Sequence, residues 1–231
     1  GHPDPMTLAA AARLTEILLC LALIQQSLEH LRRFRDERIL FAVRIVLCGL
    51  VISGLAQPWP LVGLAALSLV ILSRFQGAYN GGADRMGLLA LWCLPLSRLL
   101  PTPQGQEIAF GYLAAQLVLS YFISGGVKLL NPDWRSGRAL AQVFRFSAYP
   151  VSEALRGWAE RPRVLLAMSW AVMLFEVVFP LSLVSQPTLI VALVIAAAFH
   201  LANACLFGLN RFFWTWLATY PALLWLQARI F

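Results

Sequence analysis

Charged residues are scarce in this sequence. Only 13% of its 231 residues are Asp, Glu, Lys or Arg, whereas about a quarter are charged in a soluble domain. Lysine is almost absent, because Lys128 is alone and the other 17 of the 18 basic residues are arginine. With 60% hydrophobic residues, this composition excludes an ordinary soluble domain. The net charge of +7 lies mostly in short loops, so we expect no nucleic-acid partner.

Cysteine is sparse as well, and each of the four cysteines stands alone in a separate apolar run. They are Cys20, Cys48, Cys93 and Cys205. The sequence contains no Cys-x-x-Cys pair and no Cys/His ligand spacing, so it indicates neither a metal site nor a dithiol redox centre. We therefore expect no metal, and we expect the cysteines to be buried as small apolar side chains.

Two further patterns are missing. Alternating strand segments of about 10 residues, typical of a membrane β-barrel, do not occur. A small-x-small cleavage site does not follow the first apolar run, which argues for a membrane span rather than a signal peptide. Residues 1–5 (GHPDP), ahead of Met6, are expected to be a cloning remnant, and residues 6–231 are expected to form a single transmembrane domain.

The apolar residues that dominate the chain form runs near the ~20 residues needed to cross a bilayer. They predict an all-α, polytopic integral membrane protein, a helical bundle of about eight transmembrane helices. The runs cover about 8–28, 39–56, 61–72, 86–100, 108–130, 164–184, 188–207 and 212–231. The fourth run is short and contains Pro95, so it is expected to be kinked or only partly inserted.

The segment between the fifth and sixth runs has a different character. Residues 131–163 carry six arginines with aromatic residues between them. Within this segment Leu140, Val143, Phe144 and Ser147 recur at helical spacing. This pattern predicts an amphipathic helix that lies on the membrane surface, on the cytoplasmic side.

The arginines also predict an orientation. The loops at 29–38, 74–85, 131–163 and 208–211 fall on one side if all eight runs cross the membrane, and together they hold thirteen arginines. The opposite side has mainly Arg98 and Arg229. By the positive-inside rule, the basic loops face the cytoplasm and both termini face out. We expect the membrane to be a bacterial inner (plasma) membrane.

Ionisable side chains inside the spans are candidates for function, because each costs ~2.5–3.5 kcal/mol at mid-membrane on insertion scales. Glu176 and His200 both lie near the predicted midplane. We expect them either to meet as a hydrogen-bonded pair or proton relay, or to make ordinary interhelical contacts worth ~0.6 kcal/mol. Glu16 is expected to pair with Arg13 one turn away, and Arg44 to snorkel to the cytoplasmic surface.

The stretch YFISGGVKLLNPDWRSG, residues 121–137, stands out from the rest of the chain. Gly125 and Gly126 allow two backbones to approach closely, and Lys128 follows them at the end of an apolar run. Such a lysine either snorkels to the lipid headgroups or faces a polar cavity, where a desolvated lysine can act as a base. Any chemistry is expected near this stretch.

The same stretch resembles the signature of the HTTM family, the horizontally transferred transmembrane domain shared with vitamin K-dependent γ-glutamyl carboxylase. Asn80-Gly-Gly-Ala-Asp84 resembles the Gly-Gly-Asp loop of that family. The segment from His200-Leu-Ala-Asn203 through Leu206-Phe207-Gly208 is similar to a carboxylase segment with His, Asn and a Leu-Phe run. The resemblance covers about residues 41–226, with Leu129 at the place of a second lysine in the carboxylase.

The resemblance implies a membrane enzyme that binds a vitamin K- or menaquinone-type hydroquinone and catalyses either a carboxylation or a simpler quinone oxidoreduction. Lys128 would be the base or anion-stabilising group, and His200 and Glu176 would orient groups or relay protons. The expected cofactor-binding residues are Asn203, Trp134, Asp84, Tyr121 and Gly125. Asn203 is also open to a purely structural role between helices.

A non-enzymatic class stays open beside the enzyme. The short polar loops also suit a membrane assembly, maturation or immunity subunit that binds a protein or peptide partner among membrane lipid. A cofactor that co-purifies would favour the enzyme. A partner that co-purifies without any chromophore would favour the subunit.

Overall fold

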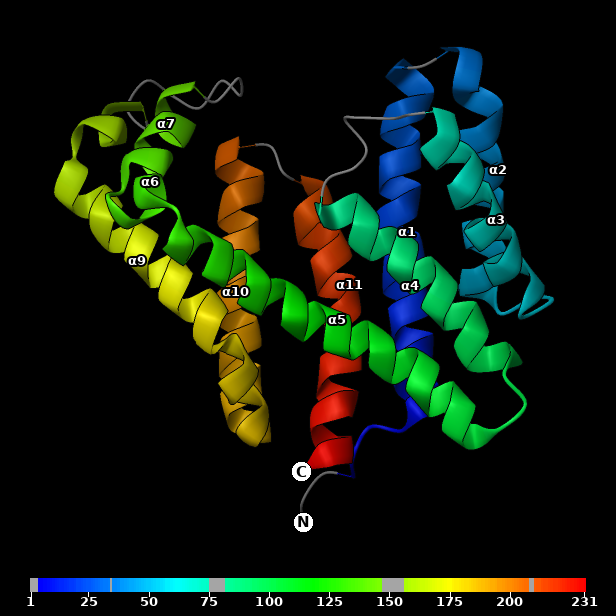
Figure 1. The fold of residues 1–231 in the computed structure, drawn as a ribbon. Helices are drawn as coiled ribbons and strands as arrows, with labels where there is room; N and C mark the ends of the chain where they lie inside the picture. Colours follow the sequence, from blue (N-terminus) through cyan, green and yellow to red (C-terminus); the bar gives the residue numbers. More distant parts are fainter. Residues whose placement is uncertain (1–3, 34, 75–81, 147–155, 208–209) are drawn as a thin grey trace. The chain divides into compact units, whose positions relative to one another are not determined.

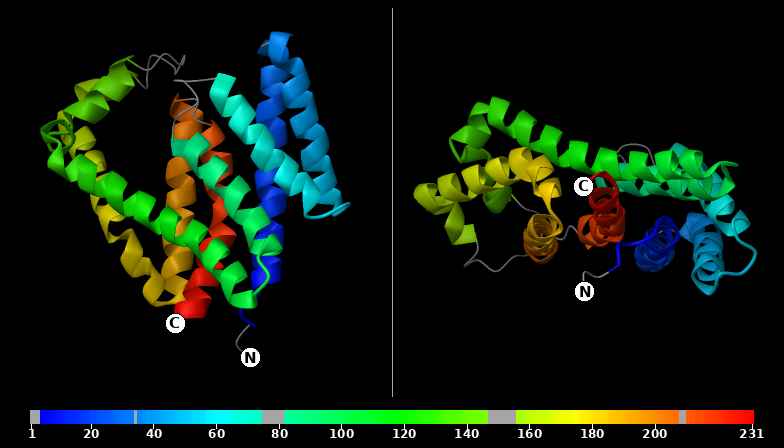
Figure 2. Two further views of the ribbon diagram at one scale, coloured as in Figure 1. Left: turned by 45° about the vertical axis from the view of Figure 1, so that its right-hand side comes forward. Right: turned by 90° about the horizontal axis from the view of Figure 1, so that it is seen from below.

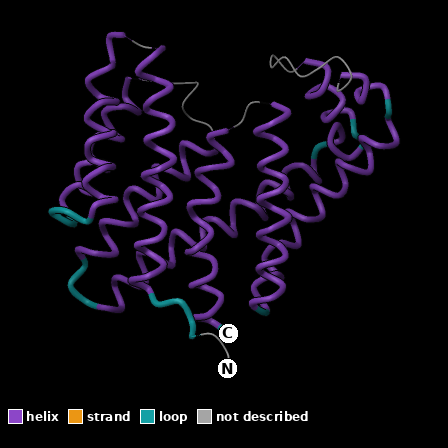
Figure 3. Tube along the Cα trace, turned by 180° about the vertical axis from the view of Figure 1, so that it is seen from behind, coloured by secondary structure: helices purple, strands orange, loops and turns teal. Residues whose placement is uncertain are grey.

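The computed structural model describes residues 4–33, 35–74, 82–146, 156–207 and 210–231. Within these ranges nearly every residue is helical and no β-strand occurs (Figure 3). The predicted all-α class is therefore confirmed for the described part of the chain.

Each of the eight apolar runs lies largely within a helix. The corresponding helices are α1 (Leu8–Arg33), α2 (Arg38–Ser53), α3 (Trp59–Arg74), α4 (Gly82–Leu99), α5 (Pro103–Leu130), α9 (Pro162–Val178), α10 (Gln186–Phe207) and α11 (Asn210–Ile230), with η3 (Phe179–Val184) continuing α9. Four of these segments are long and apolar enough to cross a membrane: Leu8–Arg32, Pro103–Leu130, Pro162–Val184 and Gln186–Leu206. The chain is thus an integral membrane protein by its helices, whereas a count of eight spans stays a prediction.

The fourth run forms a helix through its proline. Pro95 lies inside α4, and the helix continues from Gly82 to Leu99 on both sides of it. How deeply α4 inserts stays a prediction.

The chain divides into two compact units. Unit 1 comprises residues 1–115 and 211–231, and unit 2 comprises residues 116–210. Helix α5 contributes its first half to unit 1 and its second half to unit 2. The single domain predicted for residues 6–231 stays a prediction.

In unit 1, helices α1 to α4 alternate in direction and each packs against the next (Figure 1; Figure 2, left). The α1–α2 connection lies at one end of the unit. The α2–α3 and α4–α5 connections, the start of α1 and the end of α11 lie at the other end. This alternation agrees with the predicted grouping of loops within unit 1. Which end faces the cytoplasm stays a prediction.

Unit 2 is built from the second half of α5, from α9 with η3, and from α10. Three short elements lie between α5 and α9: α6 (Pro132–Arg135), α7 (Arg138–Phe146) and η2 (Gly157–Glu160). They gather at the end of unit 2 where α9 begins (Figure 1). The NPDWRSG motif is therefore a structured cap on this end of the unit.

Helix α7 lies in the segment where the sequence predicts an amphipathic helix, and it buries part of the predicted apolar face, whereas Val143 of that face is exposed. Phe144 is buried with Leu165 of α9, and Leu140 packs against the same cluster. Arg138 and Arg145 are exposed on the other face. The apolar face thus meets protein in unit 2, whereas its position on a membrane surface stays a prediction. Ser147 lies outside the described residues.

The cysteines follow the sequence prediction with one exception. Cys20, Cys48 and Cys93 are buried, as predicted, but Cys205 is exposed on α10. Leu201, one turn before it, is exposed as well. Cys205 therefore lies on an apolar face of α10 that no other part of the described chain covers, and the prediction of burial is wrong there.

Candidate functional site

The singled-out stretch 121–137 places three of its residues on one face of α5. Tyr121, Gly125 and Lys128 follow each other at intervals of four and three residues, which is the spacing of one helical face. This half of α5 belongs to unit 2, together with α9 and α10. All three helices are among the four candidate spans.

The motif after Lys128 turns the chain sharply. The Asn131 side chain caps α6 by accepting a hydrogen bond from the backbone N–H of Asp133 at 2.9 Å, and Pro132 occupies the first turn. Gly137 has φ +79°, and a Cβ there would lie 3.0 Å from the backbone of Leu166. Only glycine combines this left-handed conformation with so close an approach to α9.

Hydrogen bonds also connect this turn, at Trp134 and Arg135, to side chains of α9. The Ser169 hydroxyl donates to the backbone carbonyl of Trp134 at 2.5 Å. The indole N–H of Trp170 donates to the carbonyl of Arg135 at 3.0 Å. These bonds fix the backbone that carries the Trp134 ring.

Gly125 marks a close approach of α5 to α9. A Cβ at this position would lie 2.8 Å from the Cβ of Glu176 and 2.8 Å from the backbone nitrogen of Val177. At the next residue, Gly126, a Cβ would have nothing within 4 Å. Gly125, expected to bind a cofactor, serves in this structure as a contact point between two helices.

This contact brings a lysine and a glutamate together. Lys128 Nζ donates to Glu176 Oε1 at 2.5 Å and to Ser124 Oγ at 3.2 Å. The ammonium also lies 5.1 Å from the centre of the Trp134 ring, within cation–π range. The Lys128 side chain is 18% exposed and that of Glu176 is 5% exposed. Lys128 therefore points at α9 and does not snorkel.

The second carboxylate oxygen of Glu176 has a different environment. Glu176 Oε2 is buried and has no hydrogen-bond partner within the described ranges. Nearly all buried polar atoms are satisfied in folded proteins. The orphaned oxygen next to an amine is therefore the strongest sign of a ligand position in unit 2.

A second polar pair lies two turns along the same face of α5. The Tyr121 hydroxyl is 2.9 Å from His200 Nε2 on α10. The Tyr121 ring stacks on Phe179 with centroids 4.2 Å apart and planes inclined by 26°. Where the sequence suggested a direct pairing of Glu176 with His200, the structure describes two pairs, Lys128–Glu176 and Tyr121–His200.

The other two expected residues, Asn203 and Asp84, belong to neither pair. Asn203 lies almost one turn beyond His200 on α10 and is half-buried. Asp84 lies on α4 in unit 1, where it lines a cavity with Arg44 and Arg85. Its predicted role in cofactor binding stays a prediction.

The HTTM domain matches residues 107–227, slightly more than half of the chain. The chain belongs to the HTTM domain family. No curated protein and no solved structure matches it. The HTTM match covers both pairs of unit 2. It begins after the Asn80–Asp84 segment, so the resemblance over residues 41–106 stays a prediction.

The two pairs of the HTTM region have the groups that proton transfer requires. A lysine amine and a carboxylate in direct hydrogen bond can share one proton between two sites. A tyrosine hydroxyl and an imidazole can do the same. The region therefore holds two hydrogen-bonded pairs of titratable side chains, whose α5 members Tyr121 and Lys128 lie two turns apart.

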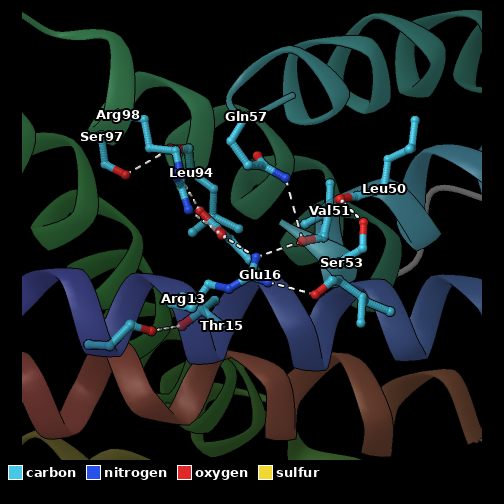
Figure 4. Close-up of polar contacts among 12 residues, drawn as sticks. Arg13, Thr15, Glu16, Leu50, Val51, Ser53, Gln57, Leu94, Ser97 and Arg98 are labelled. Carbon is cyan, nitrogen blue, oxygen red and sulfur yellow. Dashed lines mark hydrogen bonds and ion pairs between the residues drawn. The ribbon is translucent and has the colours of Figure 1, made fainter. Parts of the chain in front are cut away.

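Unit 1 contains a polar cluster outside the HTTM match. The sequence predicted its Glu16–Arg13 pair but not the participation of Arg98. Glu16 is fully buried and pairs with Arg13 at 3.3 Å, as predicted. The Glu16 carboxylate also accepts two hydrogen bonds from Arg98, one from Nε at 2.5 Å and one from Nη2 at 2.8 Å. Figure 4 shows the carboxylate between the two guanidiniums. The missed signal was Arg98 itself, a basic residue inside an apolar run on the side predicted to have few.

Arg13 extends this cluster to a third helix. It donates to the carbonyls of Val51 at 2.6 Å and Ile52 at 2.7 Å, in the last turn of α2 (Figure 4). Carbonyls at a helix C-terminus lack partners within the helix and favour cations. The cluster thus ties α1, α2 and α4 together.

The prediction for Arg44 is wrong. Its side chain does not snorkel but is buried, with the residue 7% exposed. It donates to Ser27 Oγ at 2.6 Å and to Gln26 Oε1 at 3.1 Å, both on α1. These acceptors hold the guanidinium inside the protein rather than at the headgroups.

Proposed function

We propose that this HTTM protein is a membrane-embedded enzyme that binds a quinone or hydroquinone and uses Lys128 as a base or anion-stabilising group. The observation that carries the proposal is the buried Lys128–Glu176 pair, in which one carboxylate oxygen holds the amine and the other lacks a partner. The link of the HTTM domain to the vitamin K-dependent carboxylase family supports a quinone-type ligand.

The pair suits both roles of Lys128. When Glu176 takes the proton from Lys128, the ion pair becomes a neutral pair, and a neutral amine accepts a proton from an acidic hydroxyl. When Lys128 holds the proton, its ammonium stabilises a neighbouring anion. Burial strengthens either interaction, because little water screens it.

The residues around the pair fit a hydroquinone. The orphaned Glu176 Oε2 can accept a hydrogen bond from a ligand hydroxyl. The Trp134 ring beside Lys128 can stack on an aromatic ligand. A bound hydroquinone supplies an acidic hydroxyl and two electrons. Lys128, Glu176 and Trp134 would hold it at the α5–α9 contact.

The Tyr121–His200 pair would carry the proton onward. It lies two turns from Lys128 on the same face of α5, and Phe179 holds the Tyr121 ring in place. A tyrosine and a histidine in one hydrogen bond can pass a proton between helices α5 and α10. Their role is proton relay and orientation.

Carboxylation and quinone oxidoreduction share the step that these residues serve. Both start with removal of a proton from a hydroquinone hydroxyl, and Lys128 would take that proton. We further propose that the protein resides in a bacterial inner membrane with its basic loops in the cytoplasm.

The first test is the quinone content of protein purified from native membranes in mild detergent. Mass spectrometry of the extracted lipid should find a near-stoichiometric quinone in the wild type. Lys128→Ala should retain at most about a tenth of it, since a charge-assisted hydrogen bond is lost. Arg145→Ala, which removes an exposed cation from the same unit, should retain all of it. A folded wild type without quinone would favour a non-enzymatic, partner-binding subunit.

The lone lysine allows a second test. An amine-directed reagent can modify only Lys128 and the N-terminal amine, so the N-terminus is an internal control. Added menaquinol should slow modification of Lys128 at least about tenfold, as expected for a buried contact, and leave the N-terminus unaffected. Equal rates at Lys128 with and without menaquinol would remove it from the binding site.

A double substitution separates stability from function. Lys128→Ala leaves Glu176 buried without its partner, and breaking a buried pair typically costs about 3–5 kcal/mol. The combination Lys128→Met with Glu176→Leu should restore the free energy of unfolding to within about 1 kcal/mol of wild type, because apolar side chains replace both charges. Quinone binding should still be absent. Normal quinone content in this folded double variant would overturn the proposal.

A further inference from the structure

Unit 1 contains a cavity of about 270 Å³ that the proposed function does not use. Helices α1, α2, α3, α4 and α11 enclose it. Much of its wall is apolar, formed by Leu23, Ile71, Leu72, Leu88 and Leu91. This part of the wall suits a hydrocarbon chain.

One side of the same cavity is cationic. Arg44 lines it from α2, although an arginine inside an apolar helical bundle is rare and costly. Its guanidinium is held by Ser27 and Gln26 of α1, and it lies 5.1 Å from the Phe41 ring. These contacts fix the orientation of the guanidinium before any ligand arrives, which lowers the cost of binding.

The remaining charges lie where α4 begins. Asp84 and Arg85 line the cavity from the first turn of α4. Together with Arg44 they give the lining a net charge of +1. The cavity thus combines a positively charged polar side with an apolar wall.

We propose that this cavity binds an amphiphile whose carboxylate or phosphate group meets Arg44 and whose apolar chain lies along Leu88 and Leu91. The guanidinium fork matches the geometry of either anion, and such charge-assisted hydrogen bonds are strong in an apolar setting. At about 270 Å³, the cavity lies just below the ~300–1,000 Å³ of typical small-molecule sites. It therefore takes a single chain. The ligand is a free fatty acid or one chain of an anionic phospholipid.

Photo-crosslinking of the full-length protein in nanodiscs tests the site. The probes are a diazirine-labelled palmitic acid, its methyl ester, and a diazirine-labelled phosphatidylglycerol. The acid or the phospholipid should label residues 68–72 and 84–91, as mapped by peptide mass spectrometry. The ester lacks the charge and should label them at least about tenfold less. Labelling by the acid identifies a free fatty acid as ligand, and labelling by the phospholipid alone identifies a membrane lipid.

Variants decide whether Arg44 and the cavity are responsible. Arg44→Gln should reduce labelling about tenfold, and Arg44→Lys should retain part of it. Arg74→Gln, a substitution of an exposed arginine elsewhere in unit 1, should leave labelling unchanged. Equal labelling by the acid and the ester would overturn the proposal, and so would full labelling of Arg44→Gln.

A substitution that fills the cavity tests the proposal even if Arg44→Gln does not fold. Leu88→Trp should place an indole in the cavity and reduce labelling about tenfold. Leu96→Trp, on an exposed part of the same helix, should not. Labelling of residues 84–91 that persists in Leu88→Trp would show that the probe binds elsewhere, and the proposal would fail.

Discussion

Two glutamates, one in each unit, are buried in apolar helices and paired with basic residues, yet their surroundings differ. Glu16 in unit 1 has both oxygens occupied, Oε1 by Arg98 and Oε2 by Arg98 and Arg13. Glu176 in unit 2 has Oε1 occupied by Lys128. Its Oε2 has no partner in the described part of the chain.

The partners differ in chemistry as well. Arginine keeps its proton under all ordinary conditions and binds a carboxylate with a planar fork. Lysine is a point donor that can give up its proton when buried. In the Glu16 cluster, arginine side chains contact both carboxylate oxygens and tie the helices together. In the Lys128–Glu176 pair, the cation is a lysine and Glu176 Oε2 has no hydrogen-bond partner among the described residues.

Burial of a charge is therefore a poor guide to function by itself. What separates the two sites is whether every lone pair is satisfied and whether the cation can lose its proton. By both criteria unit 1 holds a structural cluster and unit 2 holds the candidate for chemistry.

The largest effect on stability is expected in the Glu16 cluster. Glu16→Ala leaves Arg98 and Arg13 without their shared anion and should lower the free energy of unfolding by about 3 kcal/mol, the low end for a broken buried pair. The low end applies because both arginines are about one-third exposed, 34% and 32%. Denaturant titration in detergent measures it.

The matched control for this substitution is Glu29→Ala, which removes an exposed carboxylate from the same helix. It should change the free energy of unfolding by no more than about 0.5 kcal/mol. If Glu16→Ala is no more destabilising than Glu29→Ala, the Glu16 cluster does not stabilise the packing of these helices.

The next largest effect on stability is expected at the adjacent glycines Gly125 and Gly126. Gly125→Ala places a Cβ 2.8 Å from the backbone of α9 and should destabilise unit 2 by about 1–3 kcal/mol, as overpacking does. Gly126→Ala meets nothing within 4 Å and should be neutral or stabilising by up to about 1 kcal/mol. Thermal unfolding of both variants measures the difference, and equal effects would contradict the close approach of α5 to α9.

The smallest effect is expected at the Tyr121–His200 pair. Tyr121→Phe keeps the ring on Phe179 and loses only the hydroxyl, so the free energy of unfolding should fall by ~0.6 kcal/mol. Quinone content should be unchanged, while any quinol turnover should slow. A double-mutant cycle with His200→Phe measures the coupling, and zero coupling would rule out the described hydrogen bond.

Much of the fold could be predicted from the sequence. The fifth run, expected at 108–130, forms a helix over Pro103–Leu130, and the first, expected at 8–28, forms one over Leu8–Arg33. The differences have a simple cause. Hydrophobicity marks the part of a helix that suits lipid, whereas backbone hydrogen bonding continues into the polar ends.

The candidate site was predicted as a set of residues but not as a set of contacts. Lys128, Glu176, Tyr121 and His200 were all expected to matter, and the structure places all four in unit 2. The partner of each depends on how α5, α9 and α10 are rotated about their axes. A single sequence does not contain that rotation, because all faces of these helices are similarly apolar.

The sequence by itself determined that this chain is a helical membrane protein. Composition and run length settle this, since an apolar segment without backbone partners in lipid must be helical. The tertiary structure alone decided the partners: Glu176 for Lys128, Arg98 for Glu16, and Ser27 with Gln26 for Arg44. Helix packing decides them, because a buried charge takes whichever acceptor the neighbouring face presents.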